Sequence, residues 1–132
     1  MKFLKSISAM ETLEAAITTP IAVLVMLATI NLGMLVYANQ AVQAAARHGA
    51  RMGSVAQACP ACYALSGARQ EIAASPMVQS PDVSILASSG VPGSLLVVQV
   101  RGNVSNYLGG FIPGLPNPFT VSARATFRQE GW

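Results

Sequence analysis

Charged residues are scarce in this chain of 132 residues. They make up 10% of it, while hydrophobic residues reach 52%. A soluble globular domain has about 25% charged residues, and a disordered chain needs low hydrophobicity and high net charge. The composition therefore excludes a disordered protein, and the length allows one folded domain at most.

Basic residues are too few for binding to nucleic acid. Eight Lys and Arg face five Asp and Glu, which gives a formal net charge of +3. Lys2 and Lys5 are two of the eight, so the rest of the chain has only six basic residues against five acidic ones. A nucleic-acid interface needs a basic face with aromatic residues among the cations. We expect no nucleic acid partner.

Groups for catalysis and metal binding are equally sparse. Two Cys and one His cannot complete a tetrahedral zinc site without carboxylates. The sequence has no plausible set of Ser, His and acid, no paired carboxylates and no glycine-rich phosphate loop. We expect no enzyme, no cofactor, no metal and no small-molecule substrate, and His48 is expected to be a surface residue.

A long stretch without charge is what the sequence does contain. Residues 15–46 carry no formal charge, and 15–37 is the most apolar part. At about 1.5 Å per residue, a helix over 15–37 covers roughly 35 Å, enough for a hydrocarbon core of about 30 Å. Secretory signal peptides have shorter apolar regions. Lys2 and Lys5 precede the stretch, which predicts a single membrane span with its N-terminus in the cytoplasm.

The helix is predicted to continue beyond the membrane, over 10–56, because Ala-rich sequence follows the span. Small residues recur in it at every fourth position, so they share one face on which another helix can approach closely. The alternative is that small residues are simply common in an Ala-rich helix. The strip consists of Ala41, Ala45, Gly49 and Gly53.

Three residues are unusual for a plain membrane anchor. Glu14 at the inner end would cost roughly 2.5 to 3.5 kcal/mol in hydrocarbon, so its carboxylate should stay at the interface or meet a cation. Alternatively, the only role of Glu14 is to place a negative charge near the helix N-terminus, where the helix dipole stabilises it. Pro20 removes a helix hydrogen bond and predicts a kink. Asn31 lies deep in the apolar stretch.

These residues follow an ordered pattern. Pro20 follows Glu14 by six positions, Gly33 and Tyr37 lie in the apolar run, and residues 45–51 read Ala-Ala-Arg-His-Gly-Ala-Arg. In this order they resemble the TadE-like minor pilins, or pseudopilins, of tight-adherence (Flp-type, type IV-like) pilus systems. The resemblance covers roughly residues 5–55.

The resemblance implies processing of the N-terminus. Residues 1–9 correspond to a prepilin-type leader, which a prepilin peptidase would remove between Ala9 and Met10, so that Glu14 becomes the fifth residue of the mature chain. Ala9 stands where the family usually has Gly, and Asn31 stands where it often has an acidic residue.

The resemblance also implies a function. The protein would be a structural subunit, anchored in the bacterial inner membrane by its helix and later packed through that helix against other pilin or pseudopilin subunits, in an extracellular pilus or a periplasmic pseudopilus. The residues suit this assembly, because Glu14 of one subunit can neutralise the Met10 ammonium of its neighbour where water is absent.

Residues 57–132 are predicted to form a small extracytoplasmic module. Cys59 and Cys62 are separated by two residues and precede a predicted helix over 63–74. This spacing permits an internal disulfide or a redox pair. We expect a structural disulfide, since the module would lie in an oxidising compartment and the βαβ pattern of a thioredoxin-like fold is absent.

Three segments of alternating apolar residues, over 83–87, 96–101 and 119–128, predict strands. Their apolar faces would pack on the long helix as an antiparallel sheet, which gives an α+β, pilin-like fold. The loop 105–118 is rich in apolar residues and should cover a sheet edge or contact another subunit. Solvated positions are expected for Arg101, Arg124 and Arg128.

Two other functions remain open from the sequence. One is an uncleaved single-span membrane protein whose extracytoplasmic module binds a partner. The other is a membrane-tethered thiol oxidoreductase that uses Cys59 and Cys62.

Overall fold

A computed structural model describes residues 2–130, and the side chains of residues 10–130. The fold is α+β, as the sequence predicts. Its elements are α1 (Lys2–Ser54), α2 (Pro60–Ala73), β1 (Gln79–Ala87), β2 (Leu95–Val104), the 3-10 turn η1 (Tyr107–Gly110) and β3 (Phe119–Arg128).

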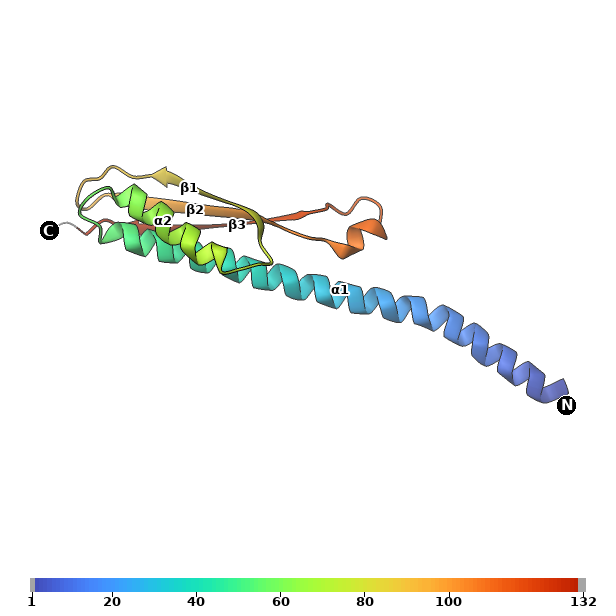
Figure 1. Cartoon of the computed structure of the whole chain (residues 1–132). Helices are drawn as coiled ribbons and strands as arrows, with labels where there is room; N and C mark the ends of the chain where they lie inside the picture. The colour runs from blue at the N-terminus through green and yellow to red at the C-terminus, as the bar shows by residue number, and fades with distance from the viewer. Residues whose placement is uncertain (1, 131–132) are drawn as a thin grey trace.

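Helix α1 runs the whole length of the molecule, and the other elements lie along its C-terminal half (Figure 1). The helix is continuous through Pro20, but its N-terminal part, blue in Figure 1, bends away from the axis of the rest. A proline inside a helix removes one hydrogen bond and crowds the preceding turn, which accounts for a bend in this region.

One stripe of α1 is buried and its spacing is helical. No side chain from Met10 to Met26 is buried or half-buried, whereas from residue 27 onward every third or fourth side chain is covered by the module. Such a stripe is the signature of a helix docked on one face. Its fully buried members are Ala38, Val42, Ala45, Ala46 and Ala50.

The sheet is an antiparallel meander in the order β1, β2, β3. Leu96, Val98 and Val100 of the central strand are fully buried and belong to the same hydrophobic core as the α1 stripe. The alternate face is polar, and the predicted exposure of Arg101, Arg124 and Arg128 is confirmed.

Strand β1 begins four residues before the predicted segment. The register with β2 shifts between Gln79 and Asp82, and such an irregularity interrupts the alternation of apolar and polar residues on which the prediction depends.

Helix α2 begins at Pro60, three residues earlier than predicted. A proline is well suited to the first turn of a helix, since its missing N–H would have no helical acceptor there. The buried residues Pro60, Ala64, Ala68 and Ile72 recur every four positions, so one face of α2 packs inward, and α2 lies beside α1 (Figure 1).

Candidate membrane and assembly site

The N-terminal part of α1 carries Glu14 and Pro20 on a helix that the module leaves uncovered. Its apolar side chains are exposed, for example Met10 (74%) and Ile17 (59%). By length and composition the helix is able to cross a membrane. Ala9 and the rest of the predicted leader have side chains outside the described residues.

Two residues of the small-residue strip, Gly49 and Gly53, face α2 of the same chain. A Cβ atom on Gly49 would lie 2.6 Å from both Ala64 O and Ala68 Cβ, and one on Gly53 would lie 2.7 Å from Ala64 Cβ. Ala45 is fully buried and Ala41 half-buried. The close approach of a second helix at Gly49 and Gly53 is therefore made inside the subunit, whereas residues 10–26 of α1 are exposed on every side.

Cys59 and Cys62 are joined by a disulfide at the start of α2, with Cα atoms 5.3 Å apart. Cys59 adopts a left-handed conformation (φ 48°), and its carbonyl oxygen accepts a hydrogen bond of 2.9 Å from the Cys62 N–H. Both cysteines are exposed. The three described strands are all antiparallel, so the parallel strands of a thioredoxin-like βαβ unit are absent from them.

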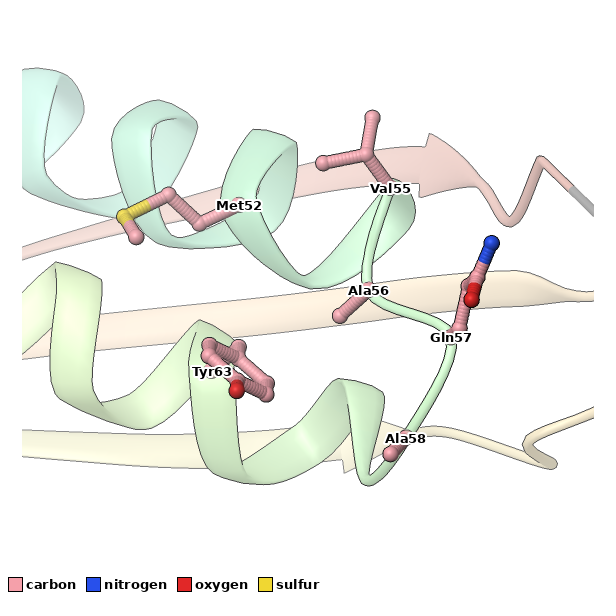
Figure 2. Close-up of a pocket in the computed structure, with 6 residues that line it drawn as sticks. All are labelled: Met52, Val55, Ala56, Gln57, Ala58 and Tyr63. Carbon is pink, nitrogen blue, oxygen red and sulfur yellow. The ribbon is translucent and has the colours of Figure 1, made fainter.

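A shallow hollow of about 420 Å³ lies beside this disulfide, where α1 passes into α2 (Figure 2). Met52 comes from the last turn of α1, Val55 to Ala58 from the connection and Tyr63 from α2. The lining has no carboxylate, imidazole, amine or thiol. Among residues 10–130, no three His, Cys, Asp or Glu side chains gather as metal ligands, and His48 is exposed as predicted.

The most specific polar contact of α1 is made by Asn31, which is only 6% exposed. Its Nδ2 donates to Asn106 Oδ1 at 3.3 Å, and its Oδ1 accepts from the Tyr107 N–H at 3.1 Å. The amide therefore satisfies a backbone donor of η1 and joins two parts of the chain that are 75 residues apart.

Asn106 continues this network inside the loop. Its Oδ1 caps η1 by accepting from the Leu108 N–H at 3.0 Å, and its Nδ2 donates to Pro116 O at 2.8 Å. The Asn106 N–H donates to Asn117 Oδ1 at 3.3 Å. The two ends of the loop are thus tied to each other and to α1.

Apolar side chains complete the contact between the loop and the helix. They line a small hollow of about 200 Å³, formed by Asn31, Leu32, Leu35, Leu108, Leu115 and Phe119. The loop therefore packs on the long helix, a contact that the sequence did not predict, and its contact with another subunit stays a prediction.

Sequence reasoning singled out Asn31 and the apolar loop but did not join them. The sequence did contain a chemical signal for this contact. A lone amide in an apolar helix needs a polar partner, and Asn106 lies near the start of the apolar loop.

Residues 11–51 match the model of the TadE-like protein family. Over these residues the long helix is similar to that family. The match includes Glu14 and Pro20 in the uncovered part of the helix and Ala41, Ala45 and Gly49 of the strip. It ends before Gly53 and before the module's other elements. This agrees with a TadE-like protein of tight-adherence pilus systems. No curated protein and no solved structure matches the chain.

Proposed function

We propose that this protein is a minor pilin or pseudopilin, a structural subunit of a tight-adherence pilus. The observation that carries the proposal is that the family match falls on a helix whose first part is left bare by its own module. A bare apolar helix is unfavourable in water, but it suits a bilayer before assembly and the core of a filament afterwards.

The proposal includes removal of residues 1–9 by a prepilin peptidase. Cleavage between Ala9 and Met10 places a new ammonium group four residues before Glu14, on the same face of the helix. A neighbouring subunit shifted along the helix axis by about 6 Å brings its Glu14 beside that ammonium. The pair compensates two charges that are costly in an apolar environment, and it sets the register between subunits.

The anchored form spans the bacterial inner membrane once. Lys2 and Lys5 favour a cytoplasmic N-terminus, which places residues 57–132 outside. The outer position suits the disulfide between Cys59 and Cys62, since disulfides persist in oxidising compartments.

The experiment that tests this function compares two carboxylates of the same exposed helix. The protein is coexpressed with a prepilin peptidase and its pilus machinery, and intact mass spectrometry measures whether residues 1–9 are lost. Glu14→Gln should stay in the membrane fraction but fail to enter sheared filaments. Glu11→Gln is the matched control, because Glu11 is also exposed and lies about one turn before Glu14, and it should assemble normally.

Three results separate the possible functions. Loss of residues 1–9 together with an assembly defect specific to Glu14→Gln supports the subunit. A chain that keeps Met1 in native cells favours an uncleaved single-span protein with a partner-binding module. Thiol-exchange activity that is lost in Cys59→Ser would favour the oxidoreductase.

A further inference from the structure

The bare part of α1 is too short to cross a membrane by itself. Between the charge of Glu14 and the first covered residue, Leu27, residues 15–26 are exposed on every side of the helix, over a length of about 18 Å. A hydrocarbon core of about 30 Å needs about 20 residues of helix. A membrane span that begins at Ala15 therefore ends near Met34. Moving the helix the other way would bury the carboxylates of Glu11 and Glu14, which hydrocarbon strongly disfavours.

The loop 105–118 lies at this depth. Its hydrogen bonds to Asn31 hold η1 beside the helix, and Leu108 and Leu115 pack near Leu32 and Leu35. Figure 1 shows the loop, in orange, extending from the sheet toward the middle of α1. Polar and exposed residues of α1 resume at Asn39 and Gln40, one turn beyond Leu35.

The outer surface of the loop has the composition of a lipid contact. No residue from Gly102 to Ala123 carries a formal charge. Tyr107, Phe111 and Ile112 are 54%, 65% and 44% exposed, so neither α1 nor the rest of the module covers these side chains fully. Tyr is enriched where proteins meet the membrane interface.

Many backbone N–H groups of the loop have hydrogen-bond acceptors within the protein, which suits surroundings with little water. A backbone polar group without a hydrogen-bond partner is costly at membrane depth, because no water is available to replace the partner. Pro113, Pro116 and Pro118 have no N–H to satisfy. Seven of the other backbone N–H groups of the loop donate hydrogen bonds within the protein. They belong to Asn106, Tyr107, Leu108, Gly109, Phe111, Ile112 and Leu115.

We propose that the loop 105–118 inserts into the outer leaflet of the bilayer beside α1, with Phe111 and Ile112 among the lipid chains and Tyr107 near the headgroups. The anchored protein is thus held by a full helix and a second, shallow element, and Asn31 fixes the depth of the module. This inference rests on the membrane-anchored form in the proposed function, and it does not depend on cleavage or filament assembly.

The experiment measures the depth of single tryptophans in proteoliposomes of phosphatidylethanolamine and phosphatidylglycerol. Trp132→Phe removes the one native tryptophan. Phe111→Trp, with Ile112→Trp as a second probe, reports on the loop, and Leu24→Trp reports on the helix. Leu95→Trp is the matched control, because Leu95 is 58% exposed in the same module but lies at the opposite end of β2 from the loop.

Nitroxide lipids labelled near the glycerol or near the chain end serve as quenchers. Phe111→Trp should have blue-shifted emission and lose most of it to the shallow quencher, Leu24→Trp should lose most to the deep quencher, and Leu95→Trp should respond to neither.

Each of the other outcomes contradicts the proposal in a distinguishable way. If Leu24→Trp is quenched while Phe111→Trp and Ile112→Trp emit like Leu95→Trp, the helix is an anchor but the loop lies in water. Blue-shifted loop emission without quenching would mean that protein, and not lipid, covers the loop. If Leu24→Trp is not quenched, the anchored form itself is wrong.

Discussion

The contact between Asn31 and η1 should determine whether the loop stays docked on α1. Asn31→Leu keeps the branched shape and the number of heavy atoms of the side chain but removes the acceptor of the Tyr107 N–H and the donor to Asn106 Oδ1. A buried donor left without a partner costs about 1 to 3 kcal/mol, and hydrogen bonds within membranes average about 0.6 kcal/mol. We take about 2 kcal/mol as the loss in free energy of docking of the loop on α1. This loss raises the equilibrium constant for loop opening about 30-fold.

Hydrogen exchange followed by mass spectrometry measures this opening in detergent micelles or nanodiscs. Peptides that cover 106–112 should exchange about 30-fold faster in Asn31→Leu, because their amides are held by the docked loop. Peptides from α2 and the central strand should not change, since they lie outside the loop.

Asn39→Leu is the control for this measurement. Asn39 is on the same helix, two turns further on, and its side chain is exposed. The reasoning is refuted if exchange over 106–112 is the same in Asn31→Leu as in the unmodified chain, or if Asn39→Leu accelerates it equally.

Two further predictions concern the junction of α1 with α2. Gly49→Ala should lower the free energy of unfolding by about 1 to 2 kcal/mol, because its Cβ would meet Ala64 O and Ala68 Cβ at 2.6 Å and overpacking outweighs the gain in helix propensity; thermal unfolding in detergent measures it. Gly33→Ala is the control, since nothing lies within 4 Å of its added Cβ, and equal loss in both variants would contradict the explanation. Reducing the disulfide, whose cysteines are 3 residues apart, should cost about 2 kcal/mol from loop-closure entropy. A reductant should lower the melting temperature of the unmodified chain but not that of the double variant Cys59→Ser and Cys62→Ser, and an unchanged melting temperature in the unmodified chain would exclude this contribution.

Much of the fold follows from local patterns in the sequence. The absence of charge over 15–46 and the strong helix formers after it predict the long helix, and alternation over 119–128 predicts β3 with the bounds that the structure has. These elements are predictable because the period of burial depends on residues close together in the chain. At the start of β1 an irregular register breaks the alternation, and the sequence pattern therefore does not predict the strand's first residues.

The partners of the singled-out residues were decided only by the tertiary structure. The spacing of Gly49 and Gly53 predicts that a helix can come close, but it does not say that the helix is α2 of the same chain. An amide at Asn31 needs a hydrogen-bonding partner, and local sequence does not identify Asn106 among the polar residues of the module. Local periodicity determines which face of an element is buried, whereas the partner of that face depends on contacts between residues distant in the chain, which form only when the whole core packs.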